Sequence, residues 1–75
     1  MLSFYNWMQA KYVLKDGKYK NNRFGDLAND MANDPQFPRA SHDREELEDY
    51  FSCLPCNEVI VTAKEALEKY IKAAT

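Results

Sequence analysis

The stretch LANDMANDPQFPRAS, residues 27–41, decides how this chain folds. Its first half places Leu27 and Met31 one helical turn apart, as on the buried face of a short helix. That helix ends before Pro35, because the residue preceding a proline is disfavoured in the α conformation. Phe37 follows in a short connection and is predicted to fill the gap between this helix and the next. This order of elements predicts a small helical bundle.

Toward the N-terminus, a first helix is predicted over Phe4–Val13, with Ser3 as its N-cap. The helix that contains Leu27 is predicted to span Arg23–Asn33, with Asn22 as its N-cap. Residues 14–23, LKDGKYKNNR, separate the two helices. An Asp-Gly pair can mark a hairpin, but the flanks are too short and too charged for strands, so we expect a mobile loop.

Toward the C-terminus, a third helix is predicted to begin near Ser41–Asp43 and to end at Pro55. Asp43 and Glu46 have the spacing of a capping box. A last helix, capped by Asn57, is predicted to run to about Ala73. Residues 59–62, VIVT, have strand propensity, but a single strand would have no partner, so the helical pattern prevails.

These elements predict an all-α bundle of four helices in one domain, residues 1–75. An apolar fraction of 45% and a charged fraction of 29% are ordinary for a soluble domain. No apolar run approaches the ~20 residues that span a bilayer, and the N-terminus lacks the pattern of a secretory signal. We therefore expect a cytoplasmic protein without membrane contact. Two cysteines are too few for a disulfide framework.

The predicted core consists of large apolar and aromatic residues at helical spacing, together with the connection residue Phe37. Ten aromatic residues in 75 can supply much of the buried area. The predicted core residues are Phe4, Trp7, Met8, Phe24, Leu27, Ala28, Met31, Phe37, Leu47, Tyr50, Phe51, Leu67 and Tyr70.

The same residues carry a family resemblance, which covers most of the chain. The matching positions are Ser3-Phe4-Tyr5, Leu27-Ala28-Asn29-Asp30, Asp34, Phe37-Pro38, Ser41, Asp43, Tyr50 and Tyr70. In this pattern the chain resembles the YozE SAM-like family of small bacterial proteins. The resemblance implies a compact bundle of four or five short helices similar to a sterile alpha motif. It implies no activity, because one fold can support many functions.

Charge is divided unevenly along the chain. Residues 1–25 hold five bases and one acid, a net charge of +4, and residues 26–58 hold nine acids and two bases, a net charge of −7. The basic segment is interleaved with Tyr12 and Tyr19, a combination that suits a phosphate backbone. The candidate nucleic-acid-binding residues are Lys11, Lys15, Lys18, Lys20 and Arg23. The alternative is a solvated loop, which the sequence pI of about 5.3 favours.

The third predicted helix offers an acidic face instead. Its candidate protein-binding residues are Asp43, Glu45, Glu46, Glu48 and Asp49. The interpretation without a binding role is that these acids interact favourably with the helix dipole on a solvated face. The functional interpretation is a docking surface for a basic partner. If the basic loop of a second copy were that partner, the contact would be heterologous, so we expect a monomer or weak self-association.

The remaining polar motifs do not complete a catalytic or metal site. Cys53 and Cys56 form a Cys-x-x-Cys pair, but the chain lacks the βαβ pattern of a thioredoxin-like protein. Zinc needs four ligands, and His42 is the only histidine. Asp26, Asp30 and Asp34 recur every four residues and are expected to be structural.

We therefore expect no enzymatic activity, no cofactor and no small-molecule substrate. The sequence predicts an interaction module whose partner is an unidentified nucleic acid or protein. A thiol redox protein that uses the two cysteines remains a distant alternative.

Overall fold

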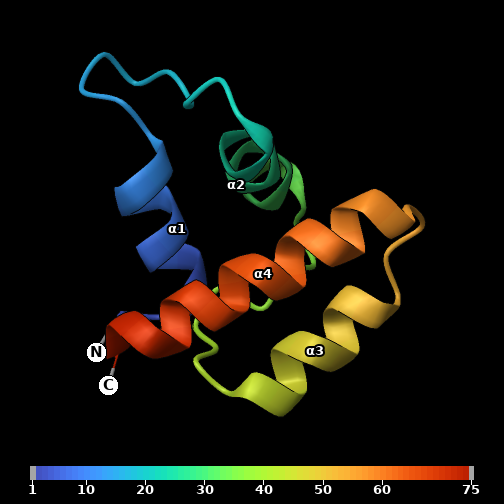
Figure 1. Ribbon diagram of the computed structural model, residues 1–75. Helices are drawn as coiled ribbons and strands as arrows, with labels where there is room; N and C mark the ends of the chain where they lie inside the picture. Colours follow the sequence, from blue (N-terminus) through green and yellow to red (C-terminus); the bar gives the residue numbers. More distant parts are fainter. Residues whose placement is uncertain (1, 75) are drawn as a thin grey trace.

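The computed structural model describes residues 2–74, which contain four helices and no extended strand. The helices are α1 (Phe4–Tyr12), α2 (Arg23–Asn33), α3 (Arg44–Ser52) and α4 (Asn57–Ala74). The predicted all-α class and the four helices are confirmed. α4 is the longest helix and packs against each of the other three, and α1 also packs against α2 (Figure 1).

Helix ends follow the local polar residues, with three differences from prediction. Asp43 caps α3 by accepting a hydrogen bond from the Glu45 amide at 3.1 Å. Its own amide donates to Ser41 Oγ at 3.2 Å, so the predicted capping box with Glu46 does not form. α3 ends at Ser52, two residues before Leu54.

The third difference lies at the start of α4. The Cys56 carbonyl accepts the first helical hydrogen bond, from the Ile60 amide at 3.0 Å. Cys56 therefore precedes the helix in the capping position, and Asn57 already belongs to α4. The predicted cap was wrong by one residue.

Phe37 is buried in the aromatic core, as predicted. It is 6% exposed. Its ring centroid lies 5.2 Å from that of Tyr50 and 6.4 Å from those of both Phe4 and Phe51. These contacts join the connection between α2 and α3 to α1 and α3. The buried core is Phe4, Met8, Tyr12, Leu27, Ala28, Met31, Phe37, Leu47, Phe51, Ala63, Ala66, Leu67 and Tyr70.

Three predicted core residues are only partly buried: Trp7, Phe24 and Tyr50. The rings of Trp7 and Phe24 pack on the core with one side and meet basic side chains with the other. Tyr50 is held at the edge of the core because its hydroxyl donates a hydrogen bond to Asp34. Helical spacing correctly predicted that these three side chains point toward the core. It did not predict the basic and polar groups that keep them partly exposed.

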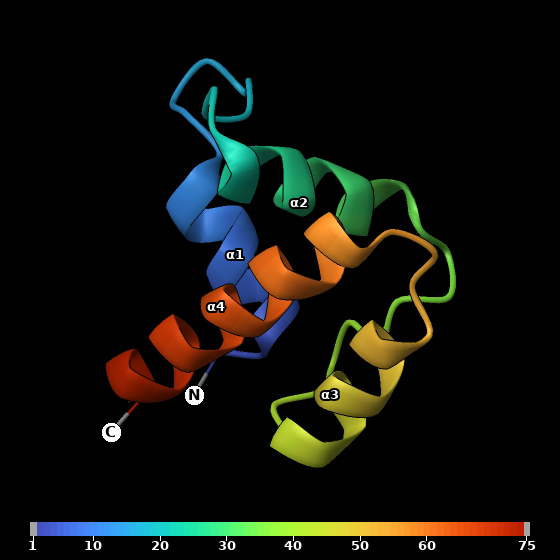
Figure 2. The same ribbon diagram turned by 45° about the vertical axis from the view of Figure 1, so that its right-hand side comes forward.

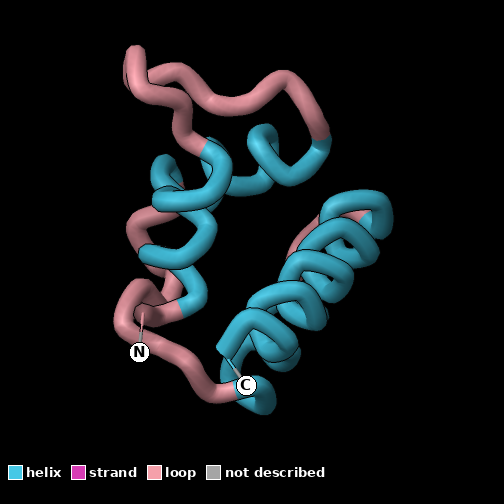
Figure 3. Tube along the Cα trace, turned by 60° about the vertical axis from the view of Figure 1, so that its left-hand side comes forward, coloured by secondary structure: helices cyan, strands magenta, loops and turns pink. Residues whose placement is uncertain are grey.

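The connection between α1 and α2 forms the hairpin that the sequence analysis rejected in favour of a loop. Val13 and Tyr19 form an antiparallel bridge, and the Leu14 amide donates to the Lys18 carbonyl at 2.7 Å. Gly17 takes a φ of 84°, a left-handed conformation that glycine adopts at little cost. The result is a minimal hairpin that projects from one end of the bundle (Figures 2 and 3). One bridge needs only a turn and a single residue on each side, so short flanks did not prevent it.

Candidate functional site

Two polar contacts fix the base of this hairpin against the helices. The Tyr19 hydroxyl donates to Gln9 Oε1 at 2.8 Å, and Gln9 Nε2 donates to the Ala28 carbonyl at 2.8 Å. The chain from Tyr19 through Gln9 to Ala28 therefore joins the hairpin, α1 and α2. The Lys20 amide also donates to the Tyr12 carbonyl at 2.9 Å, which fixes Lys20 beside the end of α1.

Gly25 allows the hairpin to approach α2. A Cβ atom at this position would lie 1.9 Å from the Lys20 carbonyl oxygen, a distance that no side chain can occupy. The Gly25 amide also donates a hydrogen bond to the side-chain oxygen of Asn22, the N-cap of α2, at 2.8 Å. The sequence interpretation missed this role, because a glycine in the first turn of a helix has no distinctive pattern without a neighbour across the fold.

Basic side chains gather over three aromatic rings at this end of the molecule. The ring centroids of Trp7 and Tyr12 lie 6.3 Å apart, and those of Tyr12 and Phe24 lie 5.5 Å apart. We call this site the cation–aromatic patch. It comprises Trp7, Tyr12, Phe24, Lys11, Lys20, Arg23 and Lys69.

Each cation lies against one ring of the patch. Lys11 Nζ is 5.3 Å from the Trp7 centroid, and Lys20 Nζ is 5.7 Å from the Tyr12 centroid. Arg23 Cζ and Lys69 Nζ lie 4.7 Å and 5.7 Å from the Phe24 centroid. Contacts of this kind are worth ~0.5–1 kcal/mol at exposed sites, enough to bias where each cation lies. Burial raises the pKa of Tyr12 above its ordinary value.

The structure therefore brings together three of the five predicted basic residues, Lys11, Lys20 and Arg23. The other two, Lys15 and Lys18, are exposed around the turn at Gly17 and contact none of the three rings. Lys69 of α4 completes the patch. The sequence analysis missed it, because helical periodicity identifies this position only as a surface position.

Arg23 also forms an ion pair outside the patch. Its Nη2 atom lies 2.6 Å from Glu65 Oε2, with both side chains about half exposed at 55% and 44%. Exposed ion pairs contribute only ~0–1 kcal/mol, so exchanging this carboxylate for another anion costs little.

The predicted acidic residues follow α3. Asp43 caps the helix, whereas Glu45, Glu46 and Asp49 are exposed and Glu48 is half-buried. Arg44, within the same segment, pairs with Glu68 of α4 at 3.0 Å. The face is negatively charged but is crossed by one inter-helix ion pair.

The other predicted motifs are spread around the connections. Cys53 directly follows α3 and Cys56 directly precedes α4, and both are exposed free thiols. Asp34 accepts hydrogen bonds from the Gln36 amide and the Tyr50 hydroxyl, which fits a structural role. Within residues 2–74, no three His, Cys, Asp or Glu side chains cluster closely enough to hold a metal ion.

No helix in the described part of the chain has the length and apolarity needed to span a membrane. No curated protein and no solved structure matches the chain significantly. The family model described as YozE SAM-like fold matches residues 3–72. This match includes α1, α2, α3 and all but the last two residues of α4, so the SAM-like bundle is the fold of the chain. The protein belongs to the YozE SAM-like family.

Proposed function

We propose that this protein is a non-enzymatic interaction module that binds the phosphate backbone of nucleic acid through the cation–aromatic patch. The observation that carries the proposal is the convergence of four bases onto one aromatic surface: Lys11 of α1, Lys20 of the hairpin, Arg23 of α2 and Lys69 of α4. Lysine and arginine bind phosphate by charge and hydrogen bonding and release its counterions.

The arrangement of the patch suits a backbone better than a single small anion. The cations lie over a row of three rings and not around one pocket, so their charges are spread along the surface. Lys15 and Lys18 extend the positive charge to the tip of the hairpin. Trp7 and Phe24 are partly exposed and provide apolar area beside the charges. The positive charges therefore follow a surface, as phosphates follow a nucleic-acid backbone.

The second candidate is a docking surface on the acidic face of α3. It is supported by the negative charge of Glu45, Glu46 and Asp49, none of which forms an ion pair with another of residues 2–74. A basic protein or a second copy of the chain is the matching partner. Binding at this surface is independent of the patch and predicts no effect of removing Lys11 or Lys20.

The proposal is tested by fluorescence anisotropy with a labelled short DNA duplex. Lys20→Gln removes one charge from the centre of the patch, and Lys64→Gln removes one charge from an exposed position of α4 outside it. We expect Lys20→Gln to weaken binding by about threefold or more, as one lost phosphate contact does, and Lys64→Gln to have little effect. Equal effects of the two variants, or no binding by the unmodified protein, would refute the proposal.

A further inference from the structure

A groove runs between α2 and the first turns of α4, on the side of Arg23 away from the hairpin. It consists of two adjoining pockets of about 180 Å³ and 170 Å³. The two share Leu27, Asp30 and Val59, so they form one continuous depression. The first pocket is polar at its edges, whereas the second extends toward α3 and is almost entirely apolar.

The apolar end can accommodate one large side chain. Phe37, Tyr50 and Leu54 line it together with Met31 and Phe51. A volume of about 170 Å³ is comparable to cavities that hold a benzene-sized group. Tyr50 and Leu54 are partly buried, so this wall is accessible from solvent. The site is therefore open and pre-formed.

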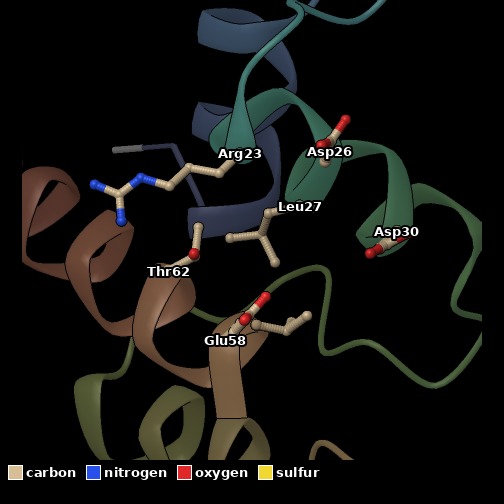
Figure 4. A pocket seen from close by; sticks show the side chains of 7 residues that line it. Arg23, Asp26, Leu27, Asp30, Glu58 and Thr62 are labelled. Carbon is tan, nitrogen blue, oxygen red and sulfur yellow. The ribbon is translucent and has the colours of Figure 1, made fainter. Parts of the chain in front are cut away.

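The other end is rimmed by carboxylates. Asp26 and Asp30 lie one turn apart on α2, and Glu58 lies across from them on α4, with Leu27 between the two helices and Thr62 one turn beyond Glu58 on α4 (Figure 4). None of the three acids forms an ion pair with another residue among 2–74. The one base at this rim, Arg23, is already paired with Glu65. The rim thus carries unneutralised negative charge beside an apolar hollow.

We propose that this groove binds a short peptide segment of a partner protein, in which a large apolar side chain is flanked by lysine or arginine. The apolar side chain fills the end lined by Phe37, Tyr50 and Leu54. The basic residues pair with Asp26, Asp30 and Glu58. Charge complementarity selects this occupant, because the same rim repels phosphate and acidic peptides.

The groove would then act separately from the cation–aromatic patch. The three carboxylates line the groove, whereas Lys11, Lys20 and Lys69 lie over the rings of the patch, and Arg23 is the one residue that belongs to both. One face would hold a nucleic acid and the other a basic partner segment. This inference goes beyond the proposed function and stands if nucleic-acid binding fails.

The test is selection of a random peptide display library on the folded, full-length protein, followed by affinity measurement of the enriched peptides. We expect enriched peptides to combine leucine or an aromatic residue with lysine or arginine. The double variant Asp30→Asn/Glu58→Gln should weaken their binding by about fivefold or more. The matched control, Asp16→Asn/Glu68→Gln, removes the same charge from exposed positions outside both the groove and the acidic face of α3, and should leave affinity unchanged.

A variant of the apolar end separates the two halves of the site. Leu54→Ala shortens a partly buried wall residue, and circular dichroism establishes that the variant remains folded. Leu54→Ala should weaken binding of the enriched peptides by about threefold or more. Affinity unchanged by both groove variants would overturn the proposal. So would enrichment of acidic peptides, or no enrichment.

The same experiments distinguish another occupant. If sedimentation of the protein alone shows concentration-dependent self-association that Asp30→Asn/Glu58→Gln abolishes, the groove binds a second copy and the partner proposal is overturned. A strict monomer that binds the enriched peptides at the groove supports it.

Discussion

The hydroxyl of Tyr50 donates a hydrogen bond to the carboxylate of Asp34, joining α3 to the residue that ends α2. The same carboxylate accepts the Gln36 amide at 3.0 Å, so one side chain organises both the turn and its contact with the next helix. Tyr50 also packs edge-on against Phe37. The connection that carries Phe37 is therefore held by polar and aromatic contacts together.

Tyr50→Phe should lower the free energy of unfolding by about 1 kcal/mol, because it removes a hydrogen bond to a charged group at a partly exposed site. Urea unfolding at neutral pH measures the change. Tyr5→Phe is the matched control: Tyr5 also packs on Phe37, and its hydroxyl has no hydrogen-bond partner among residues 2–74. A loss no larger than that of Tyr5→Phe would show that the Asp34 contact contributes nothing.

Phe37→Ala should destabilise the domain by ~3–5 kcal/mol, since it empties the centre of the aromatic core. In a domain of 75 residues the loss lowers the melting temperature by about 20–30 °C. Thermal unfolding followed by circular dichroism checks it. Phe24→Ala, at a partly buried ring, should cost less. A similar cost for the two variants would contradict the central position of Phe37.

Gly25→Ala should destabilise the protein although alanine is the better helix former. Helix propensity alone predicts a gain of about 1 kcal/mol, whereas the clash with the Lys20 carbonyl predicts a net loss of ~1–3 kcal/mol. The sign of the change in the free energy of unfolding, measured with urea, therefore decides between the propensity gain and the loss from the clash. Because the variant displaces Lys20, it should also weaken DNA binding.

Stability should fall above about pH 10, because burial raises the pKa of both Tyr12 and Tyr70. The unfolded chain releases these phenolic protons at lower pH than the folded one. The stabilisation is therefore complete below the unfolded pKa and is lost as pH rises through the folded pKa. Tyr70→Phe also removes the hydrogen bond from Tyr70 to the Leu2 carbonyl.

The difference in unfolding free energy between the unmodified protein and Tyr70→Phe isolates the contribution of Tyr70. Urea unfolding at several alkaline pH values measures it. We expect this difference to shrink as pH rises above about 10. A constant difference would mean that Tyr70 does not titrate with unfolding.

Periodicity and caps were sufficient to predict the helices. Ser3 and Asn22 cap α1 and α2 as predicted, because a cap depends only on residues within one turn. Phe37 was predictable because Pro35 and Pro38 confine a single aromatic residue between two amphipathic helices. The hydrogen bond from the Asp43 amide to Ser41 Oγ was not predictable, since Ser41 and Glu46 are both near enough to accept from that amide.

The candidate site was predictable only in part for a similar reason. Lys11, Lys20 and Arg23 lie in one basic segment, so local charge identified them. Lys69 and the close approach of Gly25 to Lys20 depend on how α4 and the hairpin pack, information that no local pattern contains. The groove acids Asp30 and Glu58 are 28 residues apart in sequence and meet only in the fold.

The most direct test of the proposed function is an amide NMR titration of the protein with a short DNA duplex at low and at moderate salt. We expect shifts centred on Lys11, Lys20, Arg23 and Lys69. If about four phosphates are contacted, affinity should fall by about 100-fold between about 50 mM and about 200 mM salt. No shifts at either salt, or shifts confined to α3, would contradict nucleic-acid binding through the cation–aromatic patch.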